Sequence, residues 1–155
     1  MVESYLVLVA LLHRIRGDIM AIGSLGDISF EVSDKKVFAF EDLKREGKMR
    51  YATHEVIGQK PILELVGPEL EQISFKINLS VSLGINPERE MQKLRDKRDA
   101  GEVMSFVLGP KVVGKNKWVI ENISETQSNI DNRGNAFTIA ADITIKEYVE
   151  RVGGK

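Results

Sequence analysis

A run of alternating apolar and polar residues is the feature that most constrains how this chain can fold. Between residues 72 and 83, every second side chain is large and apolar. A period of two residues predicts a β-strand with one buried and one exposed face. At roughly 3.3 Å per residue this strand spans about 40 Å, whereas about 5–6 residues is the usual length. The apolar positions are Ile73, Phe75, Ile77, Leu79, Val81 and Leu83, and the polar positions are Gln72, Ser74, Lys76, Asn78, Ser80 and Ser82.

The alternation returns near the end of the chain and predicts a second long strand over residues 137–146. Turn sequences rich in Gly, Pro, Asn and Asp punctuate the chain, as at Gly109-Pro110 and Asp131–Gly134. The chain is therefore predicted to be mainly β. Shorter strands are predicted at Ile28–Val32, Met49–Val56, Ile62–Val66, Val103–Leu108 and Lys117–Gln127.

One α-helix is marked at both ends, over roughly residues 87–100. Asn86 can accept the first free backbone N–H groups, Pro87 suits the first helical position, and Gly101 ends the helix. The fold class is therefore α+β, mainly β with this helix on the flank. The apolar stripe of the helix is thin, with Met91 and Leu94 as its only large members, so we expect it to lie at an edge or against another subunit.

The segment from Ser33 to Lys48 is predicted to be a loop, with a weak helix or turn at Glu41–Glu46. It is long for a connection, since about 4–6 residues are usual, and long loops often carry function. Its apolar residues are too hydrophobic to be left in water. The alternative is that the two phenylalanines cover the core of their own subunit. We predict a subunit interface formed by Val37, Phe38, Phe40, Met91 and Leu94.

The sequence contains no constellation for catalysis or metal binding. Its 155 residues include no cysteine and only two histidines, His13 and His54, neither with carboxylates at ligand spacing. A satisfied or solvent-facing strand histidine is the simpler interpretation of His54. A net charge of −1, with both signs interspersed, provides no basic field for sequence-specific nucleic-acid binding. We expect a non-enzymatic protein without cofactors.

The first 19 residues differ from the rest of the chain. Their apolar run, Tyr5–Leu12, is too short to cross a bilayer, which takes roughly 20 apolar residues, and its positive charges follow it instead of preceding it as in a secretory signal. We therefore expect no membrane role. Residues 1–19 are either a short helix packed on a neighbour or an extension that is not natural, with the start at Met20. A single domain is predicted over residues 20–150, followed by a disordered tail at 151–155.

Short sequences in a fixed order and spacing run through most of the chain. Arg50-Tyr51-Ala52 leads to Gly58-Gln59-Lys60-Pro61 and then to Gly67-Pro68, before the long strand. After it come Pro87, Leu94-Arg95, Gly101, Leu108-Gly109, Gly114, the run Trp118–Thr126, Gly134 and the strand from Phe137. This order, over about Gly26 to Glu150, resembles the GpU family of phage tail proteins. The chain departs from the family at Ser82–Asn86, which replaces a Gly-rich stretch before the helix.

The resemblance implies a structural component of a contractile phage or phage-like tail, assembled in the cytoplasm of the bacterial host. It implies an antiparallel β-barrel or sandwich similar to that of tail-tube proteins, and a homo-oligomer in the form of a hexameric ring. The implied position is the junction of tube and hub near the baseplate, with the tail tube protein, the hub protein and the tape-measure protein as partners. Two alternatives stay open. One is a tail completion or terminator protein at the head-proximal end, and the other is a monomeric β binding module unrelated to tails.

A ring gives the polar face of the 72–83 strand a specific role. Lys76 is the only charge on this face, whereas an ordinary exposed strand carries more Lys and Glu. Strong positive charge would hold DNA and apolar residues would stick to protein, so small neutral side chains suit the wall of a channel. The alternative is an exposed sheet face that happens to be rich in serine. The predicted lumen-facing residues are Gln72, Ser74, Asn78, Ser80 and Ser82.

Overall fold

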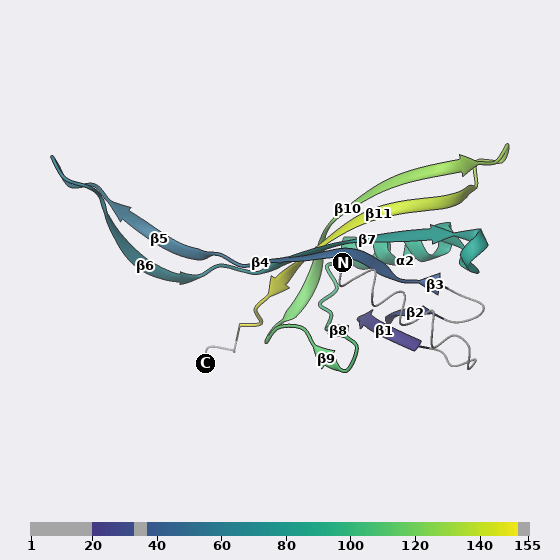
Figure 1. Ribbon diagram of the computed structural model, residues 1–155, viewed down its shortest axis with the longest axis horizontal. Helices are drawn as coiled ribbons and strands as arrows, with labels where there is room; N and C mark the ends of the chain where they lie inside the picture. The colour runs from purple at the N-terminus through teal and green to yellow at the C-terminus, as the bar shows by residue number, and fades with distance from the viewer. Residues whose placement is uncertain (1–19, 33–36, 152–155) are drawn as a thin grey trace.

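The structure, a computed structural model, describes residues 20–32 and 37–151. These residues form a four-stranded sheet, a five-stranded sheet, one α-helix and a separate two-stranded hairpin (Figure 1). Every pair of neighbouring strands among them is antiparallel. The predictions for residues 1–19, including a start at Met20, and for residues 152–155 of the tail lie outside the described residues.

The four-stranded sheet, called the long sheet below, has the strand order β10-β11-β7-β4. The alternation predicted for β7 and β11 is confirmed, because the large apolar side chains at alternate positions along both strands are mostly buried and the polar ones reach solvent. In the register of these strands, Phe75 lies opposite Ile143, which joins the two apolar faces into one. The strands are β4 (Phe40–Glu46), β7 (Gln72–Ser80), β10 (Lys117–Ile130) and β11 (Ala136–Tyr148).

Strand β7 has nine residues and ends earlier than the alternation predicts. The hydroxyl oxygen of Ser80 accepts a hydrogen bond from the backbone N–H of Ser82 at 3.3 Å, and a short 3-10 helix, Val81–Leu83, begins there. Gly84 follows with a φ of 74°, a left-handed conformation that glycine adopts without strain. The apolar residues of this turn continue the period of two by coincidence, so the pattern alone overestimates the strand.

The five-stranded sheet, called the short sheet, has the strand order β3-β2-β1-β8-β9. Phenylalanine rings fill the space between it and the long sheet. The ring of Phe75 stacks on that of Phe106, with centroids 5.8 Å apart, and meets Phe30 edge-on at 5.9 Å. These contacts place one hydrophobic core between the sheets. The strands are β1 (Met20–Leu25), β2 (Ile28–Val32), β3 (Val37–Phe38), β8 (Phe106–Leu108) and β9 (Lys111–Val112).

Helix α2 (Pro87–Asp99) packs against β7, β10 and β11. Its predicted beginning is confirmed: the side-chain oxygen of Asn86 accepts a hydrogen bond from the backbone N–H of Arg89 at 3.1 Å, and Pro87 occupies the first turn. Met91 and Leu94 are fully buried in the core. A thin apolar stripe is sufficient here because only one narrow side of the helix faces the sheet.

The prediction was a barrel or a sandwich, and the chain forms two open sheets around one core instead of a closed barrel. One other prediction about this fold is wrong. The segment Glu41–Glu46, predicted as a helix or turn, belongs to strand β4, and the predicted loop also contains β3. Its residues 33–36 lie outside the described part of the chain. A β-bulge, at which Asp42 has a φ of 51°, interrupts β4 and hides its strand periodicity.

Strands β5 (Met49–His54) and β6 (Ile62–Pro68) form the separate hairpin, which we call the arm (residues 49–68). The arm continues β4 and β7 beyond the end of the long sheet and projects away from the rest of the molecule, at the left of Figure 1. None of its residues belongs to the buried core. The sequence predicted both strands, but not that they stand apart from the sheets.

Candidate assembly surfaces

Along β7, β11 and the part of β10 after its bulge, the outer face of the long sheet consists mainly of small, uncharged polar side chains. A β-bulge in β10 between Ile120 and Asn122 turns the following residues, so that polar side chains of β10 join those of β11 and β7 on this face. Asp142 and Lys76 lie opposite each other in the register, and Lys146 pairs with Glu121 near one end of the sheet. Strand β4 adds three further charges to this face, Glu41, Lys44 and Glu46. Along β7, β10 and β11 the face includes Asn122, Ser124, Thr126, Ser128, Thr138, Ala140, Asp142, Thr144, Ser74, Lys76, Asn78 and Ser80.

The predicted lumen-facing residues lie on or beside this outer face. Gln72, Ser74, Asn78 and Ser80 alternate with the buried residues of β7. Ser82 belongs instead to the 3-10 helix, where its hydroxyl lies 2.8 Å from that of Ser80. The structure therefore extends the neutral polar surface predicted for one strand to three neighbouring strands.

The long sheet has two long free edges within the described residues. Strand β10 has 14 residues and β4 has 7. Strand β4 pairs only with β7, and β10 pairs with β11 and, at Trp118 alone, with Met104. The short sheet ends instead in β3 and β9, of two residues each, and short edge strands limit unwanted pairing. Because direction alternates across the long sheet, β4 and β10 run in opposite directions. Strand β4 of one copy can therefore pair antiparallel with β10 of another.

One face of the arm is apolar and uncharged. The register places Tyr51 opposite Leu65 and Thr53 opposite Leu63, so these four side chains share a face. Tyr51, Leu63 and Leu65 are 52%, 61% and 62% exposed. Such a contiguous apolar surface on a projecting element is typical of a contact with another protein. Sequence reasoning missed this surface because alternation along a strand does not show whether any other element covers it.

The opposite face of the arm is mixed, because His54 and Glu64 share it with Ala52 and with Ile62, which is 61% exposed. Nε2 of His54 lies 2.7 Å from a carboxylate oxygen of Glu64, and both side chains are exposed. At the tip, Ile57 is fully exposed in a turn that Gly58 completes with a φ of 72°. One side of the arm is therefore uncharged and mainly apolar, and the other carries polar and apolar side chains together.

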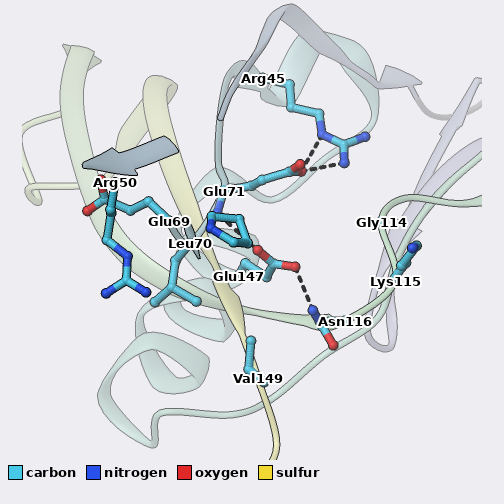
Figure 2. A pocket seen from close by; sticks show the side chains of 11 residues that line it. Arg45, Arg50, Glu69, Leu70, Glu71, Gly114, Lys115, Asn116, Glu147 and Val149 are labelled. Carbon is cyan, nitrogen blue, oxygen red and sulfur yellow. Dashed lines mark hydrogen bonds and ion pairs between the residues drawn. The ribbon is translucent and has the colours of Figure 1, made fainter. Parts of the chain in front are cut away.

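A pocket of about 740 Å³ opens at the end of the long sheet from which the arm departs (Figure 2). The carboxylate of Glu147 accepts hydrogen bonds from the backbone N–H of Glu71 at 3.0 Å and from the side-chain amide of Asn116 at 2.6 Å. These bonds stabilise the charged carboxylate and lower the pKa of Glu147 below its ordinary value. Arg45 donates to Glu71 from Nε at 2.6 Å, which fixes one wall of the pocket.

An ion-pair cluster fastens α2 to the long sheet. Arg95 of the helix donates to both carboxylate oxygens of Glu125 on β10, at 2.8 and 2.5 Å, and to Glu88 at 2.7 Å. These hydrogen bonds lower the pKa of Glu125 and raise that of Arg95. The paired oxygens fit the fork of the guanidinium, so the cluster is structural and leaves no free acid or base.

The residues predicted to form a subunit interface lie in the chain's own core where the structure describes them. Phe38, Met91 and Leu94 are at most 1% exposed, and Phe40 is 8% exposed. The rings of Phe38 and Phe40 both meet Phe30 edge-on, at 5.1 and 5.3 Å. This burial favours the alternative that the phenylalanines cover their own subunit, because it leaves almost no side-chain surface for a neighbour. Val37 lies in β3, and its side chain is outside the described part.

In the described ranges, no three His, Cys, Asp or Glu side chains are grouped so that they could hold a metal ion. No helix among the same residues has the length and apolarity needed to cross a membrane. What the described surfaces provide is shape, open strand edges and hydrophobic area.

The comparison with known proteins identifies the family. A family model described as Phage P2 GpU matches residues 26–150 of the chain. The match covers the long sheet, the arm, α2 and most of the short sheet. A search of curated proteins finds no match. The chain therefore belongs to the Phage P2 GpU family and is a structural protein related to phage tails.

Proposed function

We propose that the chain forms a hexameric ring in a contractile phage or phage-like tail, at the junction of tail tube and hub near the baseplate. The outer face of the long sheet is the observation that carries this proposal. A channel past which DNA or a tape-measure protein slides needs a wall without strong positive charge and without apolar patches. Three neighbouring strands provide such a wall, and the charges at its edges include both signs, with Lys76 3.7 Å from Asp42 and Lys146 3.5 Å from Glu121.

The free edges of the long sheet support a closed ring. Each copy offers two different edges, β4 and β10, and contacts between different surfaces of identical copies generate rings when the rotation closes. Pairing β4 with β10 of the next copy continues the antiparallel order around the ring and leaves no open edge. The outer faces of the sheets then line the lumen as a barrel. The short sheet and α2, packed on the apolar face, lie on the outside.

Membership of the family supports assembly with other tail components. We propose the tail tube protein and the hub protein as the neighbours above and below the ring, and the tape-measure protein as the molecule in its lumen. Electron microscopy of tails carrying an antibody against this chain tests the position. Label near the baseplate supports the proposal, whereas label at the head-proximal end assigns the chain to tail completion.

Cysteine labelling tests the lumen directly, because the chain has no cysteine of its own. Ser74→Cys and Ser124→Cys place thiols on the outer face of the long sheet. Both thiols should react with a bulky maleimide in the free subunit and resist it in assembled tails. Ser29→Cys, on the exposed side of β2, is the control and should react in both states. Equal labelling of Ser74→Cys in free subunits and in tails would contradict the proposal that this face lines the lumen.

A further inference from the structure

We propose that the arm of each copy lies across the pocket of the neighbouring copy, with its apolar face against that copy's sheet end. The occupant of the pocket is thus a second copy of this chain. The inference rests on the proposed ring and names the contact that fastens it.

The arm needs a partner to remain folded. An isolated two-stranded hairpin is at best marginally stable in water, because no third strand or helix covers its apolar side. Tyr51, Leu63 and Leu65 are all more than half exposed, so their own chain does not cover them. One side of the arm is uncharged and mainly apolar, whereas the other carries the hydrogen-bonded side chains of His54 and Glu64. The uncharged side is therefore the one suited to lie on another protein.

The pocket and the root of the arm lie at the same end of the long sheet. Arg45 is near the end of β4, Glu71 immediately precedes β7, and Asn116 immediately precedes β10. Glu147, in the same pocket, is near the end of β11. Figure 2 shows Arg45 bonded to Glu71 and Glu147 bonded to Asn116 in this pocket. In a ring of equivalent copies, all the arms therefore leave their sheets at one height along the ring axis, and all the pockets open at that same height.

Strand tilt carries the arm sideways over the next copy. Strands of closed barrels tilt by about 35–45° from the axis, and the arm continues two such strands. The seven residues of β6 extend about 23 Å at roughly 3.3 Å per residue, which gives a sideways reach of about 15 Å. That reach corresponds to about three strand spacings of roughly 4.8 Å. Because β4 of one copy pairs with β10 of the neighbour in the proposed ring, the arm of the first copy crosses the ends of β10 and β11 of that neighbour.

The pocket has the chemistry to receive the apolar face. Its wall includes Leu70 and Val149, which are 43% and 53% exposed. Three charged side chains at its rim have no ion-pair partner among the described residues, namely Arg50, Glu69 and Lys115. The arm's tip region carries one unpaired charge of each sign, Glu55 and Lys60. An arm and a pocket with both signs of charge can therefore form complementary pairs around an apolar centre.

Disulfide trapping in tail particles tests this contact. Leu63→Cys on the arm and Val149→Cys at the pocket are combined in one chain, incorporated into tails and oxidised. We expect a ladder of cross-linked chains on a non-reducing gel, because each link joins two copies. Leu63→Cys with Ile130→Cys is the matched control, since Ile130 is 57% exposed at the end of β10 that lies far from the pocket, and should give no ladder. Co-expression of the two single variants replaces the double variant if that one does not assemble.

The outcomes separate this contact from the ring itself. Tails that contain the chain but give no ladder overturn the arm–pocket contact and leave the ring in place. A disulfide formed by Leu63→Cys alone also overturns it, because that link requires two arms to pair with each other. Tails that lack the chain altogether overturn the proposed function. As a second measurement, Tyr51→Ser with Leu65→Ser should abolish incorporation while the melting temperature of the subunit stays unchanged.

Discussion

At the scale of single residues, the packing of the short sheet depends on the absence of one side chain. Gly23 lies where β1 approaches β8, and a Cβ at this position would be 2.3 Å from the carbonyl oxygen of Val107. Because that oxygen belongs to the backbone, it cannot turn away as a side chain could. Gly23→Ala should therefore force β1 and β8 apart and lower the free energy of unfolding by about 1–3 kcal/mol.

Chemical denaturation of the purified subunit measures this loss. Gly47→Ala is the matched control, because its new Cβ would meet the side chain of Glu71 at 3.6 Å, an ordinary contact. The control should be close to neutral. Equal stability of Gly23→Ala and the parent would show that β1 and β8 are not held at this distance.

The Arg95–Glu125 pair gives a pH dependence with a defined sign. Hydrogen bonding to Arg95 lowers the pKa of Glu125 below its ordinary 4.5, so the folded state favours the charged carboxylate. This contribution to stability is present above about pH 4.5 and is lost as the pH falls through the lowered pKa. Glu125→Gln should cost about 1 kcal/mol at pH 7, a low value for charged hydrogen bonds because the pair partly reaches solvent.

Denaturation of parent and Glu125→Gln at pH 7 and pH 3 checks this expectation. The stability difference should shrink at the lower pH. Glu121→Gln, in an exposed pair 3.5 Å from Lys146, is the control and should change little at either pH. A difference that stays constant between the two pH values contradicts the assignment.

At the scale of elements, α2 raises the question of whether the few apolar residues of a helix pack in the core of their own chain or contact another subunit. Leu94 is fully buried against the long sheet, whereas Leu63 of the arm is 61% exposed. Leu94→Ala should destabilise the isolated subunit by about 2–5 kcal/mol, because it leaves a cavity in the core. Leu63→Ala makes the same chemical change and should leave the thermal unfolding of the subunit unchanged. If Leu94→Ala impaired only assembly, α2 would be an interface helix.

The sequence predicts elements well where a local signal determines them. Asn86, Pro87 and Gly101 mark the helix because capping involves residues next to each other in the chain, and the alternation of β11 needs no knowledge of its neighbours. Burial is different. Phe38 and Phe40 were assigned to a partner because Phe30, which covers them, comes from another strand. The apolar face of the arm was missed for the converse reason, since nothing local shows that no strand covers Leu63 and Leu65.

At the scale of the whole molecule, folding and assembly use separate parts of the chain. The buried core draws its residues from the two sheets, α2 and the adjoining loops, and none from the arm. The outer face of the long sheet, the edges of β4 and β10 and the arm surround this core without being needed to fill it. The subunit should therefore fold before it meets its neighbours, and assembly should bury the surfaces that folding leaves exposed.

Replacing the arm by a tight turn separates these two roles. Met49 and Pro68 lie opposite each other in the register, so residues 50–67 can be exchanged for the two-residue turn Asn-Gly. The shortened subunit should unfold within a few degrees of the parent, because no core side chain is removed. It should remain monomeric in light scattering and be absent from tails, because the proposed contact with the next copy is lost. A large fall in melting temperature would show that the arm stabilises the core of its own subunit. Normal incorporation into tails would show that pairing of the sheet edges holds the ring together without the arm.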